Sequence, residues 1–542
     1  MRRTRMDRRT FLVGVGTTSL AVVVAACAPS STAPSASSSA STVPTRPARG
    51  GKATLGVLRD PNELDPSSLT SGATSTYSEL FYNTLWRSTL TASGFVAEPE
   101  LAESWEFTDP TTLVFKLRKG VQFHDGSGFD ANVAKWNFDK LIAPDSKSLV
   151  KAQLAAIYKS TQVVDQYTFR MNLVGPSGVL WFANNSNVFN VGAFMLSPAY
   201  YEKVGPTEVA RTPMGTGPFR LVEWVKGDHL TARRFENYWN KDSFGVQLPY
   251  LDEVTYKPVA DTTVLFNALR TGSLDWITAI LPTDVKTAQS DPSLKVVIDQ
   301  GSVQGMTLNV VTGPFQDRRR REAVSWAIDR EAIHSGVYLG YGFVPKWLMP
   351  EGSEWIDPSV PYYTYDPAKA KAALAQAVVP GGFKFQLTID NTTAMNQLAQ
   401  VIQAQLKDVG IDVAIIPVQP GVTTQKGQKG DFDALLQDSA GLAATISPYD
   451  PSFGVGRPFS YTADTVAKAL PLSQELGRTN DRARAKDLNA QIQRILFDDP
   501  GQFPGVTLHG GASIKAMRKE LMGHQPSAHP AFLFVDRLWW QK

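Results

Sequence analysis

The sequence predicts a mixed α/β fold with more than one compact unit. Its 542 residues exceed the roughly 100–200 residues of one domain. A hydrophobic content of 43% and an aromatic content of 10% are sufficient for buried cores. Strand-like and helix-like patterns alternate along the chain, and residues 384–418 show strand, helix and strand in succession. Because a strand–helix–strand unit joins parallel strands, we expect at least one partly parallel sheet.

Residues 1–26 are typical of an export signal. Five arginines and a single acid precede an apolar stretch from Phe11 to Ala26, and this order of features defines a secretory signal. The alternative is a membrane anchor, but these 16 residues fall short of the roughly 20 needed to span a bilayer. Arg8-Arg9-Thr-Phe-Leu resembles a twin-arginine export motif. Paired arginines also occur in ordinary signals, so the export route stays open.

The only cysteine, Cys27, follows this signal directly. The sequence Val-Ala-Ala-Cys27 resembles a bacterial lipobox, which implies that Cys27 is lipidated and becomes the mature N-terminus. A single cysteine forms neither an internal disulfide nor a cysteine-based zinc site. After it, residues 27–50 are rich in serine and proline and lack apolar periodicity, so we predict a flexible tether.

The formal net charge of +3 belongs to the export segment. Without residues 1–26, which hold five arginines and one aspartate, 49 basic and 50 acidic residues remain, a net charge of −1. The charge balance therefore gives no indication of an acidic partner.

In the body, periodicity and capping residues predict individual elements. Residues 52–58 and 113–118 read as strands, and residues 130–141 read as a short helix. Asp317 and Asp366 are predicted to cap the starts of two further helices.

The clearest unit lies between residues 384 and 418. A strand over 384–390 precedes an amphipathic helix with apolar residues spaced along 398–409. Gly410 stands where a glycine commonly ends a helix, and 411–418 reads as the next strand.

Searches for catalytic motifs find none. The sequence has no GxSxG, GxxxxGK[ST], GxGxxG or HExxH pattern, and Gly215-Thr-Gly217-Pro218 places a proline where a phosphate cradle needs a backbone N–H. The basic run 318–321 is spread around a helix, so we predict a solvated helix start with one or two arginines turned inward rather than a nucleic-acid surface. We therefore expect no catalytic residue, cofactor, resident metal or nucleic-acid partner.

Several segments together resemble the signature of the family 5 solute-binding proteins, the peptide, nickel and related binding lipoproteins of ABC importers. The similarity covers about residues 51–542. Its segments occur in family order: 99–105 with 115–126, 215–219 through 238–239, 272–275, 321–330 and 365–370.

The resemblance implies a two-lobed, type II periplasmic-binding-protein-like fold, with an extra domain appended to lobe I and a ligand cleft between the lobes. It also implies ligand capture by hinge closure and delivery to an ABC permease and ATPase. The protein would be a monomer outside the cytoplasm, held to the membrane or in the periplasm by its lipid anchor only. The implied segments are 51–77, 211–285 and 505–542 for lobe I, 78–210 for the appended domain II, and 286–504 for lobe II.

Most signature residues are predicted to be structural. His124 lies in a tight turn over 123–126 and is expected to form a fold-stabilising hydrogen bond. Gly215 and Gly217 are expected to permit close approach of two backbones.

Ligand contacts are implied on three stretches, 70–73, 276–280 and 443–449. For the aromatic residues among them, packing in the core or at the rim is an equally good interpretation. The predicted contact residues are Ser71, Gly72, Trp276, Thr278, Trp347, Thr445, Ser447 and Tyr449.

The third stretch departs from the peptide-binding pattern of the family. In that pattern a tryptophan and then an aspartate shortly precede an acidic–proline pair, and the aspartate captures the peptide ammonium. Before Asp450-Pro451 this chain has Ala444 and Ser447, and a serine cannot supply the charge-assisted bond. Asp438 or Asp450 remains as a substitute. We therefore predict a neutral or anionic solute rather than a peptide with a free α-amino group.

Nickel is not indicated, because His334, His509, His524 and His529 form no motif.

Two other functions stay open. A secreted lipoprotein hydrolase would show steady product formation, and a sensory or chaperone-like binding module would lack neighbouring permease and ATPase genes.

Overall fold

A computed structural model describes most of the chain from residue 46 onward. The predicted export signal, Cys27 and most of the tether lie outside the described residues. Those described are 46–68, 72–91, 94–148, 151, 154–155, 158–175, 193–346, 349–350, 355–419, 422–439, 459, 461–476, 478–479, 481–500, 506–526 and 532–541.

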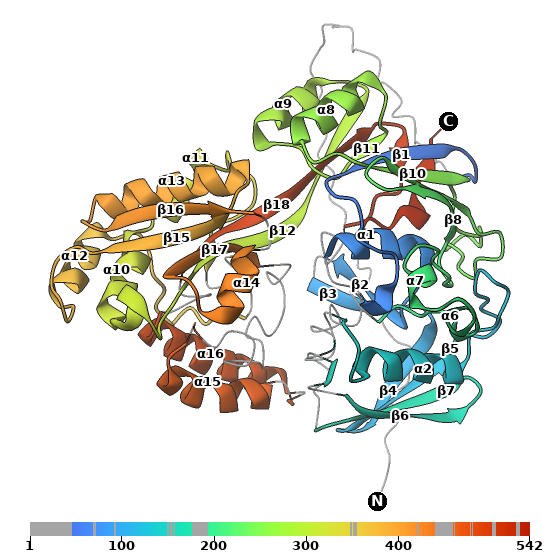
Figure 1. The fold of residues 1–542 in the computed structure, drawn as a ribbon, viewed down its shortest axis with the longest axis horizontal. Coiled ribbons are helices and arrows are strands. Elements are labelled where there is room, and N and C mark those ends of the chain that lie inside the picture. Colours follow the sequence, from blue (N-terminus) through green and yellow to red (C-terminus); the bar gives the residue numbers. More distant parts are fainter. Residues whose placement is uncertain are drawn as a thin grey trace, which may run out of the picture. The chain divides into compact units, whose positions relative to one another are not determined.

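Among these residues, ten strands form one mixed sheet (Figure 1). β1 pairs in parallel with β10 and β11, and β15 pairs in parallel with β16 and β17, whereas the other neighbours are antiparallel. This confirms the predicted mixed α/β class. The order is β16 (Asp412–Val418), β15 (Lys384–Asp390), β17 (Ala434–Ser439), β12 (Leu294–Leu308), β18 (Thr507–Arg518), β11 (Trp276–Ile277), β1 (Lys52–Val57), β10 (Glu253–Pro258), β9 (His229–Arg234) and β8 (Phe219–Val225).

The long strands β12 and β18 belong to both halves of this sheet. Residues 303–308 of β12 pair with β17, whereas residues 294–300 pair with the half of β18 that also contacts β11. The register between β12 and β18 shifts after residue 300. Figure 1 shows these two strands running from one group of elements to the other.

On the side of β1, the sheet is packed on both faces. One face carries Leu55, Trp276 and Met517 and packs with α1, and the other carries Ile277 and Ala516 and packs with α8 and α9. The short elements here are α1 (Gly72–Phe81), α8 (Thr262–Thr271), α9 (Val285–Ser290), the 3-10 helices Pro66–Ser68, Pro282–Asp284 and Val535–Arg537, and the pair β19 (Leu521–Met522) with β20 (Trp539–Trp540).

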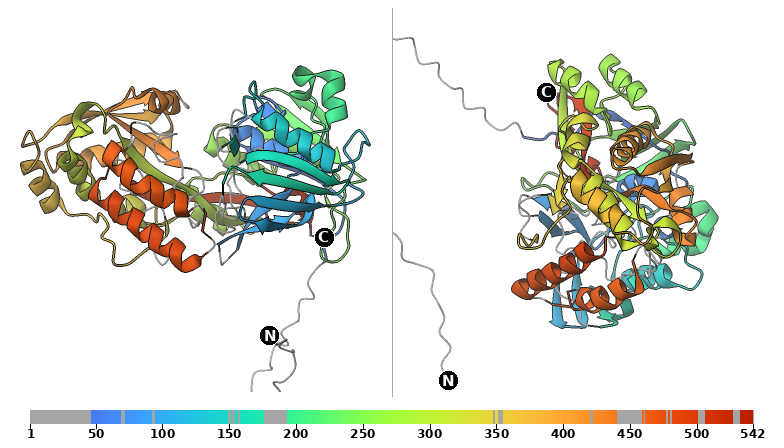
Figure 2. Two further views of the ribbon diagram at one scale, coloured as in Figure 1. Left: turned by 90° about the horizontal axis from the view of Figure 1, so that it is seen from below. Right: turned by 90° about the vertical axis from the view of Figure 1, so that its left-hand side faces the viewer.

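On the side of β15, helices enclose a second apolar core that includes Leu308, Leu387 and Leu398. Helices α15 and α16 lie side by side and bury a smaller core around Leu488 (Figure 2). The elements are α10 (Arg318–Ala327), α11 (Arg330–Gly336), α12 (Pro367–Ala375), α13 (Thr393–Lys407), α14 (Val422–Lys429), α15 (Ala463–Leu476), α16 (Arg482–Asp498), the 3-10 helix Gly313–Gln316, and the pair β13 (Pro345–Lys346) with β14 (Met349–Pro350).

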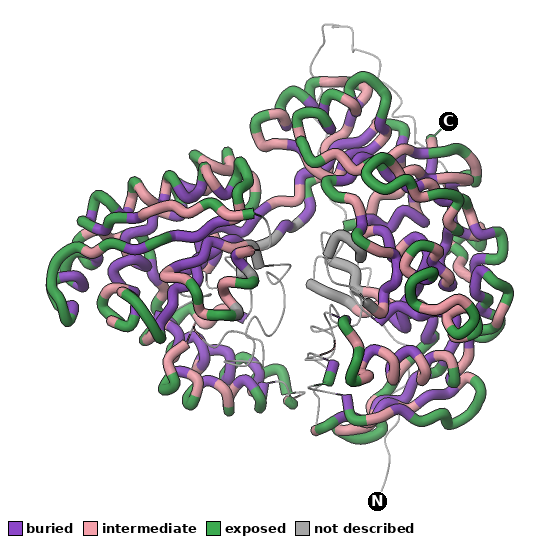
Figure 3. The backbone as a smooth tube through the Cα atoms, in the orientation of Figure 1, coloured by how far each residue is buried: buried purple, intermediate pink, exposed green. Residues whose placement is uncertain are grey.

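A separate four-stranded antiparallel sheet covers helix α2. Its core stacks Phe115, Phe138 and Phe169, with ring centroids 5.2 Å and 5.7 Å apart. In this sheet the inner strands β5 and β7 are mostly buried, whereas the edge strands β4 and β6 and the outer helix faces are largely exposed (Figure 3). The elements are β4 (Ala102–Asp109), β5 (Thr112–Leu117), β7 (Thr168–Leu173), β6 (Tyr158–Asp165), α2 (Ala131–Ile142), the hairpin β2 (Trp86–Thr91) with β3 (Gly94–Pro99), α6 (Pro198–Val204) and α7 (Pro206–Val209).

The predicted elements are confirmed with small shifts at their ends. The pattern at 52–58 is β1, that at 113–118 is β5, and that at 130–141 is α2. Asp317 and Asp366 each accept a hydrogen bond from a first-turn backbone N–H of α10 and α12.

The strand–helix–strand unit is β15, α13 and β16, and its two strands are parallel as predicted. The helix begins at Thr393, before the first apolar residue of the pattern, because Thr392 caps it. Gly410 has φ of 90°, which suits the turn that leads into β16.

The predicted structural roles of three signature residues are also confirmed. His124 is buried, and its Nε2 lies 3.0 Å from the carbonyl oxygen of Gly217. Burial lowers the pKa of His124 to about 4, so the ring is neutral near pH 7. A Cβ on Gly215 would lie 2.2 Å from the carbonyl oxygen of Phe81, so only glycine permits this approach of backbones.

The basic run at the start of α10 has one arginine turned inward, as predicted. Arg318 and Arg319 are exposed and contact Glu322, whereas Arg321 is buried and forms an ion pair with Asp499. The run therefore serves α10 and its packing against the end of α16.

Candidate functional site

Two of the predicted ligand-contact residues have described side chains, Trp276 and Thr278. Gly72 is the first residue of α1. The other predicted contacts, Ser71, Trp347, Thr445, Ser447 and Tyr449, lie outside the described residues.

Trp276 lies on β11 with no exposed surface and packs in the core beside Leu55 and Met517. Its ring meets that of His524 edge-on, with centroids 5.5 Å apart. The indole Nε1 is buried and has no hydrogen-bond partner in the described part of the chain. Its described contacts are therefore core packing, and its contact with a ligand stays a prediction.

Thr278 joins the segment after β11 to the neighbouring strand. Its backbone N–H and its Oγ1 both donate to the carbonyl oxygen of Gly56, at 3.1 Å and 3.2 Å. The side chain is half-buried, and because the hydroxyl donates in this bond, its oxygen keeps both lone pairs as acceptors.

Next to Trp276 lies a buried group of charges from β12 and β18. Lys515 Nζ donates to Asp299 Oδ2 at 2.9 Å, and His524 Nε2 lies 3.0 Å from the same oxygen. The side chains of Lys515 and Asp299 are 1% and 4% exposed. Burial alone would raise the pKa of Asp299, but the His524 hydrogen bond and the Lys515 charge together lower it. Asp299 is therefore an ionised and well-paired carboxylate.

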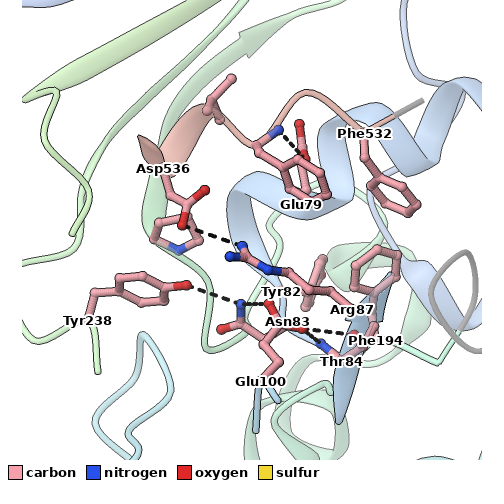
Figure 4. Close-up of a pocket in the computed structure, with 13 residues that line it drawn as sticks. Glu79, Tyr82, Asn83, Thr84, Arg87, Glu100, Phe194, Tyr238, Phe532 and Asp536 are labelled. Carbon is pink, nitrogen blue, oxygen red and sulfur yellow. Dashed lines mark hydrogen bonds and ion pairs between the residues drawn. The ribbon is translucent and has the colours of Figure 1, made fainter. Parts of the chain in front are cut away.

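A pocket opens between α1, β2 and the C-terminal segment, where the predicted domain II meets lobe I (Figure 4). About 490 Å³ of space lies within its walls and mouth. It is lined by Glu79, Tyr82, Asn83, Thr84, Arg87, Glu100, Phe194, Pro218, Tyr238, Phe532, Phe534, Val535 and Asp536.

Glu79 attaches α1 to the C-terminal segment at one wall of this pocket. Its Oε1 accepts from the backbone N–H of Leu533 at 2.9 Å, and its Oε2 accepts from that of Phe534 at 3.0 Å. Burial raises the pKa of Glu79 to about 8, although these hydrogen bonds act to lower it.

The opposite wall is a polar network around Asn83. Asn83 donates to Glu100 at 2.7 Å and lies 3.3 Å from the Tyr238 hydroxyl. Glu100 also accepts from the backbone N–H and hydroxyl of Thr84, at 2.7 Å and 2.8 Å. Arg87 approaches Asp536 only to 3.9 Å, and Figure 4 shows that carboxylate directed at its guanidinium.

Glycines line the point where β12 and β18 cross from one half of the sheet to the other. A Cβ on Gly301 would lie 2.9 Å from the backbone of Gly511. Gly342 has φ of 95°, and a Cβ there would lie 2.2 Å from the carbonyl oxygen of Gly510. Close backbone contact at this crossing therefore depends on residues without side chains.

Beside this crossing the structure brings together two histidines that the sequence did not pair. His334 Nδ1 lies 3.0 Å from His509 Nε2, although the residues are 175 positions apart. Burial and the nearby His334 lower the pKa of His509 to about 3, and the ring of Tyr338 stacks on it at 3.7 Å. Within the described residues, no group of three or more His, Cys, Asp or Glu side chains is placed to hold a metal ion.

The helices give no evidence of a membrane-spanning segment. In the described part of the chain, none combines the length and the apolar character that crossing a bilayer requires.

Comparison with known sequences identifies the family and related proteins. The family described as "Bacterial extracellular solute-binding proteins, family 5 Middle" matches residues 96–460. The glutathione-binding protein GsiB of Pectobacterium atrosepticum is 30% identical over 502 residues, which cover 87% of this chain and 91% of that protein.

Solved structures share the fold. The ABC transporter-associated periplasmic binding protein DppA from Helicobacter pylori, in complex with the peptide STSA, has a TM-score of 0.77 at 23% identity, covering 91% of this chain and 99% of its own. NikA from Brucella suis, in complex with Fe(III)-EDTA, has a TM-score of 0.77 at 21% identity, covering 91% and 100%. The fold is therefore the two-lobed periplasmic binding architecture, and its known ligands differ widely in chemistry.

Proposed function

This chain belongs to the family 5 bacterial extracellular solute-binding proteins, which serve ABC importers, and from that premise we propose that it is a lipid-anchored receptor that captures its solute by hinge closure. It would act as a monomer, present the solute to an ABC permease with its ATPase, and catalyse no reaction. The observation that carries the proposal is the family match over residues 96–460, joined to similarity with a solute-binding relative over 87% of the chain.

The proposed hinge is the crossing of β12 and β18. Separate apolar cores lie on either side of it, and the register shift after residue 300 interrupts the strand pairing between them. Contacts that a solute makes only in the closed form would shift the population toward that form. The lobe and domain boundaries stated above belong to this proposal.

We propose a peptide-like organic solute, with glutathione as the first candidate. The GsiB relative is named for glutathione binding. Glutathione carries a net negative charge near pH 7, which agrees with the predicted anionic class. Its γ-glutamyl residue also keeps a free α-ammonium group, for which Ser447 offers no carboxylate, so Asp438 or Asp450 would have to supply that contact.

The test is to identify what the purified protein retains and what stabilises it. Mass spectrometry of the denatured protein would show any retained solute. A thermal-shift series would then compare glutathione, ordinary dipeptides, sugars, organic acids and metal chelates, since a bound solute raises the unfolding midpoint. Small-angle X-ray scattering with the best solute should show a smaller radius of gyration. Steady conversion of that solute to a product would contradict the proposal.

The anchor is tested separately at Cys27. Replacing Cys27 with alanine removes the lipid attachment point, so the variant should leave the membrane fraction and appear in the soluble fraction. Membrane retention equal to that of the unchanged protein would contradict lipidation.

A further inference from the structure

In the pocket between α1 and the C-terminal segment, the buried carboxylate of Asp536 has incomplete hydrogen bonding among the described residues. This residue is 5% exposed, and its Oδ2 has no hydrogen-bond partner among the described residues. Arg87 and Arg537 approach that oxygen to 3.9 Å and 3.8 Å, which is too far for either to donate a hydrogen bond. A buried carboxylate oxygen without a donor is costly, so a donor from outside the chain would stabilise it.

Charge in the pocket favours a cationic donor. Three carboxyl groups line it, from Glu79, Glu100 and Asp536, against the single guanidinium of Arg87. Arg87 is also 3.5 Å from Glu98, which lies just outside. An entering anion would be repelled by the Asp536 carboxylate, whereas an entering cation would be attracted to it and would favour the ionised forms of Glu79 and Glu100.

The aromatic side chains that line the pocket suit an alkylammonium ion. Aromatic rings from Tyr82, Phe194, Phe532 and Phe534 line the pocket, and such rings attract ammonium groups through their faces. A hydrated metal ion would find fewer oxygen ligands here, since Glu79 and Glu100 already accept hydrogen bonds from the chain.

We propose that this pocket binds the primary ammonium group of a small amine, with Asp536 accepting its N–H bonds, Glu79 supplying a counter-charge and the aromatic rings enclosing its carbon atoms. Of the predicted cleft segments, residues 276–280 are fully described, and none of them lines the pocket. The proposal is independent of the identity of the transported solute.

Proton linkage provides a signature of this site. Burial raises the pKa of Glu79 to about 8, so below that pH the group is mainly protonated and carries no charge. An entering ammonium group would favour the ionised form and release a proton, so its affinity should rise as the pH rises toward 8. The charged and titratable groups that face Glu79 and Asp536 are Arg87, Glu100, Tyr238, Tyr256, Lys515 and Arg537.

The first experiment uses ethylammonium as the probe on the full-length protein. Ligand-observed NMR would be recorded at constant ionic strength with ethylammonium chloride, ethanol, sodium acetate and potassium chloride in separate samples. We expect saturable binding of ethylammonium with a dissociation constant on the order of millimolar, because three heavy atoms supply little binding energy. Ethanol, acetate and potassium should not compete. Equal competition by ethanol or potassium, or preferential binding of acetate, would overturn the proposal.

The second experiment changes the two carboxyl groups. D536N and E79Q should each weaken ethylammonium binding at least about tenfold, and E79Q should also remove the rise in affinity between pH 6 and 8, which reaches about tenfold per pH unit in the unchanged protein. E202Q, at an exposed position of α6, is the control and should bind like the unchanged protein. Because E79Q removes an attachment of the C-terminal segment, each variant is first checked by its thermal midpoint. Unchanged affinity in a folded D536N variant would overturn the proposal, as would a flat pH profile in the unchanged protein.

Discussion

Two groups of buried charges lie on the same side of the sheet. They differ in whether the oxygens of the central carboxylate, Asp299 or Asp536, receive hydrogen bonds from described side chains. In the group from β12 and β18, Lys515 reaches Asp299 at 2.9 Å and His524 adds a second bond to it. In the pocket beside α1, Arg87 lies 3.9 Å from Asp536, whose Oδ2 accepts no hydrogen bond from the described residues. The side chains of Asp299 and Asp536 are 4% and 7% exposed, so burial of the carboxylate alone does not explain the difference. A carboxylate whose oxygens are hydrogen-bonded within the protein indicates a structural role. A carboxylate oxygen without such a bond is available to a ligand.

The two groups also differ in how their carboxyl groups respond to burial. For Asp299, paired charge and hydrogen bonds outweigh burial and lower the pKa. For Glu79, burial outweighs three backbone hydrogen bonds and raises the pKa to about 8. A full counter-ion therefore matters more than several neutral donors.

The largest change in the free energy of unfolding is expected when Lys515 is removed from its buried ion pair with Asp299. Lys515→Met would leave the Asp299 carboxylate buried without its cation and lower the free energy of unfolding by about 3–5 kcal/mol. Urea unfolding would measure this loss. Lys295→Met is the matched control, because Lys295 lies on the same face of the sheet and its Nζ donates to the sulfur of Met522 rather than to a carboxylate. Adding Asp299→Leu to Lys515→Met should recover part of the loss. A loss as small as that of the control would contradict the structural role of the pair.

The next largest effect concerns the pH dependence of the free energy of unfolding, to which Glu79 and Asp299 should contribute in different pH ranges. Glu79 has a folded-state pKa above its unfolded value of 4.5, so its contribution to stability is full below that value and is lost as the pH rises through about 8. The free energy of unfolding should fall by up to about 1.4 kcal/mol per pH unit in this window. Asp299, with a lowered pKa, should lose its contribution only on acidification below 3.8. Chemical unfolding at a series of pH values measures both, and Glu79→Gln should flatten the alkaline branch alone. An alkaline branch that persists in Glu79→Gln would show that another group causes it.

The smallest effect is expected at Asp536. Asp536→Asn removes no hydrogen bond that Oδ2 makes to the described residues and weakens only the longer ion pairs with Arg87 and Arg537, so the free energy of unfolding should fall by about 1 kcal/mol. Asp299→Asn, by contrast, weakens bonds from Lys515 and His524 and should cost more than about 2 kcal/mol. The pair of variants, measured side by side by urea unfolding, sharpens the comparison. Similar losses in the free energy of unfolding for Asp536→Asn and Asp299→Asn would contradict the proposed difference between the two carboxylates.

Much of the local structure could be predicted from the sequence, because its causes are local. Asp366 before a proline predicted the start of α12, and the apolar spacing along 398–409 predicted α13. The family-like segments predicted the two-lobed architecture through resemblance rather than through periodicity. The order of the central sheet had no local signal, since β18 is inserted between β12 and β11 from the far end of the chain.

The candidate sites were less predictable for the same reason. Glu79 meets the backbone of Leu533 across 454 positions, and His334 meets His509 across 175. No spacing rule connects such residues. The position of Trp276 after a family turn agreed equally well with a ligand contact and with core packing, and the fold places its ring in the core.

The position of β18 also bears on how the protein is made. This strand is among the last segments to be synthesised, yet it is the shared neighbour of β11 and β12. The backbone donors for Glu79 lie later still, at residues 533 and 534, and Trp540 then donates its indole N–H to the carbonyl oxygen of Lys52 at 2.8 Å. Synthesis from the N-terminus therefore leaves β11 and β12 without the strand that lies between them until residues 507–518 have emerged. A polypeptide that stops before residue 507 lacks the centre of its own sheet, so premature termination yields an open, protease-sensitive chain rather than a receptor with one lobe missing.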